Sequence, residues 1–539
     1  MEKPRRRSRK VLTEFFMGIE IMKRSAVMLY LTVVFSVFTI AQNTTSTLTG
    51  TTSDSDDILP GAVVKVTEVE SGVTYSAISN QKGQFRITGL TPGGPYRLEV
   101  TYVGHKKSVI DIKRISLGEV YSCDVNLTAG NELQEVIVKG QAAALRKTGS
   151  SENISSEDID NKATIDRSLQ DILAMSPYYI GSGSFGGRDG GMNNYSVDGA
   201  NFNANMGLDR EKMPGAGTPF ALEALEDIQI VNSAFDVKNS NFMGATINAV
   251  TKKGTNTFRG SAYHFYKDES LRGNRVDGEE LSSPRDDIKR TIYGLTLGGP
   301  IIKDKLFFFV SAELENTPLQ LHQWQASKDG VEDGKNLISR VTESDMKQFA
   351  SDLQTMYGWN PGSYNDFTGD NKFFRLMTRI DWNISNNHKF TLRYNQTNGK
   401  KDNSYSSPGM GMGDGRVSIY SMVFDGSNWK KVDNVYSLTG ELNSRFGNNI
   451  SNTLRASFTF NDANNRECDA AFPCIEIMKP YDGDGKNLIS RVTESDMKQF
   501  ASDLQSMYGW NPGSYNDFTG DNKFFRLMSQ YRLEHIKIP

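Results

Sequence analysis

The feature that most constrains the fold is an alternation of apolar and polar residues that begins at Phe258 and continues, with interruptions, toward the C-terminus. In residues 453–461, the sequence TLRASFTFN has an apolar residue at every second position. A period of two places alternate side chains on opposite faces of a β-strand. The pattern therefore predicts about eight strands, at residues 258–267, 290–298, 305–315, 373–383, 389–395, 435–443, 453–461 and around Phe524.

Strands of this kind have one apolar and one polar face, and two architectures use them. In a transmembrane β-barrel, the apolar face meets lipid and the polar face lines the lumen. A soluble β-sandwich buries the apolar face and exposes the polar one. The alternation alone leaves both readings open. A hydrophobic content of 37% is low for a helical membrane protein, whereas it suits a barrel whose strands are only half apolar.

A compact α/β unit is predicted before these strands, at residues 141–257. Ser155 with Asp158 forms a helix-capping pattern. Residues 244–251 are small and apolar, as in a buried strand, and the polar sequence KKGT ends this run. The glycines of GSGSFGG are not followed by Gly-Lys-Ser/Thr, so we reject a phosphate-binding loop. An apolar helix face is expected from Ile165, Leu169, Ile172 and Leu173.

The first part of the chain predicts export followed by a small β-sandwich. Residues 1–41 are interpreted as an N-terminal extension plus a signal peptide cut after Ala41, with Met22 as the hypothetical true start. The apolar core of this segment is shorter than the roughly 20 residues of a comfortable span, and an uncleaved anchor is the alternative. Residues 43–130 contain short alternating stretches split by turns, which is typical of a sandwich. They show no candidate nucleophile or metal cluster, so we expect a binding or spacer domain.

A short apolar strand, NELQEVIVKG at residues 131–140, connects the sandwich to the α/β unit. Val136, Ile137 and Val138 favour an extended backbone. Such a segment can add to the sheet of a partner through main-chain hydrogen bonds. Two alternatives remain open: a last strand of the sandwich, or a plain linker.

The end of the α/β unit resembles a known family. VDG at 197–199, LEDIQIV at 225–231, GATINAVTKKGTN at 244–256 and FRG at 258–260 follow in the order seen where the plug of TonB-dependent outer-membrane receptors passes into the first barrel strand. LTLGGPIIKDKLFFFVSAELEN at 295–316 resembles the Oar-like branch of that family, with a tight turn at Lys303-Asp304-Lys305.

The sandwich resembles a second family. PGAVVKV, SNQKGQFRITGL and YRLEVTYVG, which lie between Pro60 and Gly104, are similar to the carboxypeptidase regulatory-like domain often found before such plugs in Bacteroidetes-type bacteria. Both resemblances together imply a mainly β fold: an N-terminal β-sandwich, an α/β plug and, at 258–539, an incomplete transmembrane antiparallel β-barrel. They also imply a location in the outer membrane of a Gram-negative cell.

The resemblance further implies partners and site residues. Residues 131–140 resemble the TonB box, so the expected partner is TonB of the inner-membrane energy-transducing complex. Other expected partners are outer-membrane lipid, a surface lipoprotein, and a small or oligomeric substrate of unknown identity, carbohydrate included. The TonB-contacting residues are then Leu133, Gln134, Glu135, Val136, Ile137 and Val138. As plug-loop residues that contact the ligand we nominate Met192, Asn193, Asn194, Asn201, Asn203, Asn205 and Met206.

Nothing in the sequence indicates catalysis, a metal site or a cofactor. The five histidines are scattered without metal-ligand spacing, and no Gly-x-Ser-x-Gly elbow is followed by a suitable histidine. A net charge of −3 argues against a nucleic-acid partner. Cys468 and Cys474 either pair in an oxidising compartment or remain free thiols.

Two features suggest a truncated chain. Residues 333–377 recur at 484–528 with one difference, Thr355 against Ser506, which we interpret as a recent duplication or an assembly error. Eight strands cannot enclose the plug, whereas this family closes barrels of about 22 strands. We therefore expect a receptor fragment that does not transport as it stands. The competing hypothesis is a surface or periplasmic β-rich adhesion or binding protein.

Overall fold

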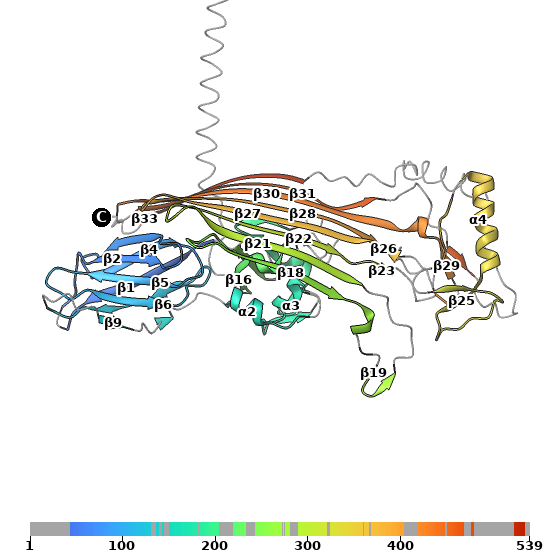
Figure 1. The fold of residues 1–539 in the computed structure, drawn as a ribbon, viewed down its shortest axis with the longest axis horizontal. Helices are drawn as coiled ribbons and strands as arrows, with labels where there is room; N and C mark the ends of the chain where they lie inside the picture. Colours follow the sequence, from blue (N-terminus) through green and yellow to red (C-terminus); the bar gives the residue numbers. More distant parts are fainter. Residues whose placement is uncertain are drawn as a thin grey trace, which may run out of the picture.

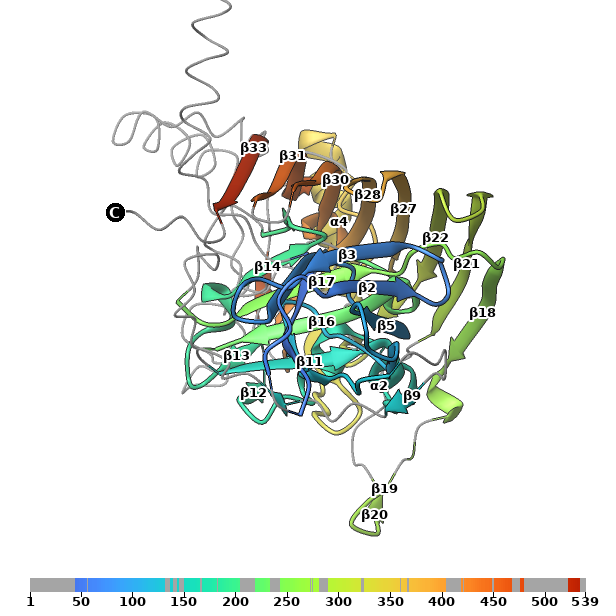
Figure 2. The same cartoon turned by 90° about the vertical axis from the view of Figure 1, so that its left-hand side faces the viewer.

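A large curved sheet dominates the computed structural model, and two smaller units lie against its concave side (Figures 1 and 2). The structure describes residues 44–533 except 56, 131–135, 139–142, 145–149, 165–166, 182, 204–218, 233–242, 272, 274, 281–288, 321–323, 359, 366–367, 404–417, 420, 448–449, 468–475 and 479–521. The predicted signal peptide, Leu133 to Glu135, Asn205, Met206, Cys468 and Cys474 lie outside the described residues, as does most of the second copy of the repeat.

The large sheet has eight antiparallel strands, in sequence order from one edge to the other. Figure 2 looks along these strands and shows them curving around the α/β unit. Its edge strands are not paired with each other in the described part of the chain, so the sheet is an open wall. The strands are β18 (Arg259–Lys267), β21 (Arg290–Ile302), β22 (Leu306–Asn316), β27 (Asn371–Ser385), β28 (His388–Asn403), β30 (Trp429–Phe446), β31 (Ile450–Glu467) and β33 (Asn522–Leu533).

The two faces of this wall settle the choice that the alternation left open. In β31, Leu454 and Phe458 are 39% and 42% exposed, whereas Arg455 between them is 2% exposed. Apolar side chains thus point away from the protein and polar ones point inward, the reverse of a soluble sandwich. Further buried polar residues of the inner face are Ser311, Glu313, Arg375, Arg379, Thr391, Arg393, Asn395, Thr397, Ser437, Thr439, Glu441, Ser457, Thr459 and Asn461.

The α/β unit, which we call the plug, is a five-stranded mixed sheet in the order β11-β16-β17-β14-β15. Ser155 caps α2 in a capping box with Asp158, as predicted, and Ser168 caps α3 in the same way. All six residues of β17 are buried, because this strand is central and is covered on both faces. The elements are β11 (Ser151–Ser155), α2 (Ser156–Asn161), α3 (Leu169–Leu173), β14 (Asn194–Val197), β15 (Ala200–Asn201), η3 (Leu222–Ala224), β16 (Leu225–Val231) and β17 (Thr246–Thr251).

The N-terminal unit is a β-sandwich, which we call the regulatory domain. One sheet contains β10-β7-β1-β4 with β8, and the other has the order β3-β2-β5-β6-β9. Its core includes Leu48, Val64, Val66 and Leu98, none of them exposed. The strands are β1 (Ser46–Ser53), β2 (Val63–Glu68), β3 (Thr74–Ile78), β4 (Gln84–Leu90), β5 (Tyr96–Thr101), β6 (Ser108–Ile112), β7 (Val120–Ser122), β8 (Val125–Asn126), β9 (Val136–Val138) and β10 (Ala143–Ala144).

A small module lies at the end of the wall farthest from the regulatory domain (Figure 1). It is built on α4 (Glu343–Tyr357), which packs through Met346 into a core with Val341, Met422 and Phe424. No helix in the described part of the chain has the length and apolar character needed to cross a membrane. The remaining short elements are β12 (Tyr179–Gly181), β13 (Ser184–Phe185), η2 (Gly190–Met192), η4 (Glu269–Leu271), β19 (Arg275–Val276), β20 (Glu279–Glu280), β23 (Leu319–Gln320), β24 (Gln325–Ser327), β25 (Ile338–Thr342), β26 (Thr368–Gly369), β29 (Ser421–Val423), η5 (Asp425–Ser427) and β32 (Glu476–Met478).

Candidate functional site

The candidate site is the contact between the plug and the inner face of the wall, and it begins at a tight turn. Asp198 and Gly199 connect β14 to β15 with φ angles of 52° and 79°. Gly199 tolerates this left-handed backbone at no steric cost, and a Cβ atom there would collide with the guanidinium of Arg455. The Asp198 carboxylate accepts hydrogen bonds from the backbone N–H of Thr251 at 3.0 Å and from its hydroxyl at 2.9 Å. The turn therefore fixes the end of the central plug strand.

Charged side chains of the wall face this turn. The Nε atom of Arg393 on β28 lies 3.5 Å from Asp198 Oδ1. The same arginine donates to Glu441 of β30 at 3.1 Å, and Arg455 of β31 donates to Glu441 at 2.8 Å. Asp198, Arg393, Glu441 and Arg455, which we call the charge cluster, thus hold two cations and two anions. All four side chains are at most 4% exposed.

Another wall arginine holds the same end of this plug strand. Arg379 of β27 donates to the backbone carbonyl of Thr251 at 2.7 Å. Its guanidinium is held in place by Asp381, at 2.8 and 3.0 Å. The last residue of β17 is therefore bound by the wall through its carbonyl and by Asp198 through its N–H and hydroxyl.

Aromatic and charged contacts join the helical side of the plug to the first wall strand. The guanidinium of Arg167 lies 3.8 Å from the ring centre of Phe265 and also pairs with Glu223. Tyr263 donates from its hydroxyl to Glu313 at 3.0 Å. Arg375 in turn bridges Glu313 and Glu315, at 2.9 and 2.7 Å.

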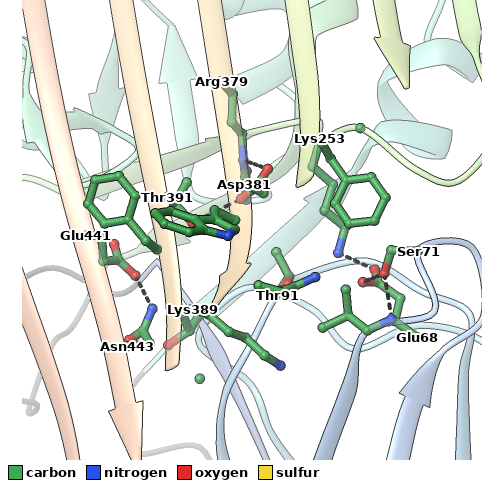
Figure 3. A pocket seen from close by; sticks show the side chains of 18 of the residues that line it. Glu68, Ser71, Thr91, Lys253, Arg379, Asp381, Lys389, Thr391, Glu441 and Asn443 are labelled. Atoms are coloured by element: carbon green, nitrogen blue, oxygen red, sulfur yellow. Dashed lines mark hydrogen bonds and ion pairs between the residues drawn. The ribbon is translucent and has the colours of Figure 1, made fainter. Parts of the chain in front are cut away.

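The regulatory domain completes the buried interface. Thr44 donates to Glu441 at 2.9 Å, which ties the start of the described chain to the charge cluster. Figure 3 shows the narrow cavity where all three units meet, with Glu68 facing Lys253 and with Lys389 and Asp381 contributed by the wall. Lys389 donates to the backbone carbonyl of Thr74 at 3.1 Å. The cavity is about 40 Å³, which has room for water but not for a nutrient.

The predicted TonB-contacting segment is described only in part. The backbone of β9 pairs in parallel with β6, with Val136 opposite Ser108 and Val138 opposite Ile110. Val136 to Val138 therefore form the edge strand of a regulatory-domain sheet, as in the alternative of a last sandwich strand. This pairing does not test binding to TonB, which stays a prediction.

The predicted ligand-contacting residues occupy two environments. Asn193 and Asn194 are fully buried, and Asn193 binds the carbonyl of Gly183 at 2.7 Å and the N–H of Ala245 at 2.9 Å. Asn203 accepts from the N–H of Tyr195 at 2.8 Å, and its backbone carbonyl accepts from Asn461 of the wall at 2.9 Å. Met192 is 41% exposed, so it is available for contact. Ligand contact by this set stays a prediction.

Sequence reasoning found the turn but missed its partners. Asp198 belongs to the VDG motif, whereas the alternation marks Arg393, Glu441 and Arg455 only as polar positions of strands. The sequence signal for these three residues is a charged side chain on the polar face of a strand. Such a residue must be solvated or paired in a filled lumen. In the described ranges, no group of three His, Cys, Asp or Glu side chains is placed to hold a metal ion.

Comparisons with known proteins define the class. Residues 250–323 match the outer membrane beta barrel domain, and residues 47–128 match the carboxypeptidase regulatory-like domain. The chain is 25% identical over 377 residues to the TonB-dependent transporter Oar of Myxococcus xanthus, covering 65% of this chain and 33% of Oar. The chain therefore spans about a third of the length of that relative.

Solved structures with a similar arrangement include the outer membrane transporter YddB of Escherichia coli, at 13% identity and a TM-score of 0.41, covering 58% of this chain and 39% of YddB. The siderophore receptor PirA of Acinetobacter baumannii is 14% identical with a TM-score of 0.37, covering 60% of this chain and 43% of PirA.

An inward-polar wall that curves around an α/β unit has the sidedness of an outer-membrane β-barrel. More particularly, the chain is a homologue of the TonB-dependent transporter Oar, and it carries a carboxypeptidase regulatory-like domain. Its place is the cell outer membrane.

Proposed function

We propose that this chain is the gate-bearing part of a TonB-dependent transporter that admits a nutrient through the outer membrane. The observation that carries the proposal is the charge cluster, in which Asp198 of the plug meets Arg393, Glu441 and Arg455 of the wall with every side chain buried. Buried ion pairs do not add much stability, but removing one partner from them costs about 3–5 kcal/mol. We therefore expect this contact to keep the plug bound to the wall until a mechanical force separates them.

The proposed work comes from TonB, which binds Leu133 to Val138 as an added strand. Strand addition uses main-chain hydrogen bonds, and the edge position of β9 suits it. The segment precedes β11 along the chain, so a pull on it loads the first plug strand. No covalent step is involved, so the proposal needs no catalytic residue and no cofactor.

Met192, with Asn201 and Asn203 of the following turn, is proposed to contact the ligand from the plug. Siderophores, cobalamin, oligosaccharides and peptides all fit a gate of this kind, and the described residues do not choose among them. A surface lipoprotein is proposed as a further partner at the outer mouth.

Binding of purified periplasmic TonB tests the proposal. The variant Val136→Pro with Val138→Pro removes two main-chain donors, and we expect binding to fall by at least about tenfold, because a proline cannot supply the N–H of a strand pair. The matched control is Val136→Thr with Val138→Thr, which keeps the donors and the β-propensity. Equal affinity of the proline variant and the wild type would contradict the proposal.

The second candidate is an adhesion or binding protein, and the module around α4 favours it. This module has its own core, with Met346, Met422 and Phe424 fully buried, and it stands apart from the plug (Figure 1). Deletion of residues 133–138 in the complete gene product separates the two candidates. A transporter loses uptake, whereas an adhesin keeps its attachment.

A further inference from the structure

The regulatory domain contacts the plug at a partly buried node of charged and amide side chains around Arg114. Arg114 follows β6 and reaches the plug strand β16. Its Nη1 atom lies 3.0 Å from Glu226 Oε1, and its Nη2 atom lies 3.1 Å from Asp227 Oδ2 and donates to the Glu226 carbonyl at 2.6 Å. Asp227 is fully buried, so the arginine neutralises a charge that water does not reach.

The node also includes the first plug strand. Asn153 of β11 donates to Asp227 Oδ1 at 3.1 Å and to the backbone carbonyl of Leu117 at 3.0 Å. Gln229 of β16 donates to the same Leu117 carbonyl at 2.9 Å. The loop of the regulatory domain that carries Arg114 and Leu117 is therefore bonded to β11 and β16 together, across the antiparallel pair that they form.

A second set of contacts ties the same domain to the point where the plug passes into the wall. Glu68 pairs with Lys253, and Glu70 pairs with Arg259 at 2.7 Å. The backbone carbonyl of Glu70 accepts from the N–H of Asn256 at 3.0 Å. The regulatory domain is thus bound at the start of the plug and at its end.

The path of the chain gives these contacts a mechanical meaning. The segment proposed to bind TonB is strand β9, whose backbone is paired with β6, and β6 leads within two residues to Arg114. The chain then continues from β9 to β11. A load on β9 therefore reaches β16 through the regulatory domain as well as reaching β11 through the linker, and the node joins the two paths.

We propose that the regulatory domain is an autoinhibitory clamp on the plug, held by Arg114, Asn153, Glu226 and Asp227, and that it must detach before β11 is pulled away from β16. This inference rests on the proposed function for the source of the load. A force applied to β9 acts first on the contacts between the regulatory domain and the plug. The plug therefore stays folded when the force is too weak or too brief to break those contacts.

Optical-tweezers measurements on the full chain test the clamp. The native cysteines are replaced by alanine, and DNA handles are attached at Leu133→Cys and at Lys303→Cys in the turn between β21 and β22. At constant force, the wild type should show detachment of the regulatory domain before plug unfolding. Arg114→Ala leaves the buried Asp227 carboxylate without its cation, so the lifetime of the docked state should fall by about tenfold or more.

The matched control is Arg97→Ala, which removes an arginine paired with Asp111 inside the regulatory domain, where both side chains are about half exposed. The docked state of the Arg97→Ala variant should have the same lifetime as that of the wild type. Hydrogen exchange of the unloaded protein gives a second readout: residues 151–155 and 225–231 should exchange faster in Arg114→Ala and unchanged in Arg97→Ala.

An unchanged lifetime in Arg114→Ala, or plug unfolding that precedes detachment in the wild type, would overturn the clamp. The assay contains no TonB, so its result is separate from the binding test above. Loss of the clamp with intact TonB binding refutes only the clamp, and an intact clamp without TonB binding refutes only the proposed function.

Discussion

Asp198 of the plug and Arg393 of the wall lie 3.5 Å apart, and their side chains are 1% and 4% exposed. Each has other partners, Thr251 for the aspartate and Glu441 for the arginine. The pair therefore couples a turn of the plug to two strands of the wall. Because the two residues belong to units that would separate in the proposed gate, their interaction is a natural place to measure how firmly the plug is held.

Replacing Arg393 by methionine should loosen the plug. The change removes the cation that lies 3.5 Å from the buried Asp198 carboxylate, and the loss of one partner of a buried ion pair costs about 3–5 kcal/mol. Hydrogen exchange in β14 and β17 of the full chain should become faster by at least about a hundredfold. The double variant Asp198→Asn, Arg393→Met should recover part of the protection, because the unpaired charge is gone.

The control for this change is Lys372→Met, which removes a lysine paired with Asp370 at 2.7 Å on the surface, where both side chains are about 60% exposed. An exposed pair contributes only about 0–1 kcal/mol, so plug exchange should not change. If Arg393→Met behaves like this control, the charge cluster does not hold the plug.

Replacing Gly199 by alanine should destabilise the plug for two reasons that a second variant separates. The φ angle of 79° is unfavourable for alanine by roughly 1–2 kcal/mol, and the added Cβ atom would collide with Arg455. Gly186 has a φ of 57°, but no atom lies within 4 Å of the Cβ that alanine would add. Gly186→Ala therefore tests the cost of the left-handed backbone without a steric collision. Thermal unfolding of the plug should shift more for Gly199→Ala, and equal shifts would exclude the collision.

Much of the fold followed from local patterns, whereas the site did not. The wall strands and β17 were predicted at their places, because alternation and small-residue runs are local signals of burial. Alternation does not predict strand β6, since Val109 and Ile110 are both buried and the period of two is lost there. The other members of the charge cluster come from three strands far along the chain, and only the curvature of the sheet brings them together near Asp198.

The capping box of α2 gives a prediction with a pH dependence. Ser155 donates to Asp158 from its hydroxyl at 2.6 Å, and this hydrogen bond lowers the pKa of the Asp158 carboxyl below its ordinary 3.8. A lowered pKa means that the stabilisation is present above pH 3.8 and is lost as the pH falls through the folded-state value. Ser155→Ala should destabilise α2 by about 0.5–2 kcal/mol at neutral pH. Hydrogen exchange across residues 156–162 measures this, and a loss that is as large below the folded-state pKa as at neutral pH would contradict it.

The pair of His105 and Asp54 gives a prediction of opposite sign. The ring Nε2 atom of His105 lies 3.0 Å from Asp54 Oδ2, and this hydrogen bond raises the pKa of His105 above its ordinary value of 6.5. The stabilisation is therefore complete below pH 6.5 and is lost as the pH rises through the folded-state value. The loop that carries His105 is also joined to the strand end before the predicted TonB-contacting segment, since the Lys106 N–H donates to the Thr128 carbonyl at 2.9 Å.

An NMR titration of the full chain, with the His105 signal assigned from a His105→Gln variant, should show this raised pKa. Asp54→Asn should return the pKa of His105 toward 6.5, because the amide does not favour the charged imidazolium over the neutral ring. Asp57→Asn is the matched control, since Asp57 is bound to Asp54 through its backbone: its N–H donates to Asp54 Oδ1 at 2.7 Å, and its carbonyl accepts from the Asp54 N–H at 2.9 Å. A His105 pKa that is unaffected by Asp54→Asn would show that the carboxylate does not set it, and the loop would then keep its stability across pH 6 to 8.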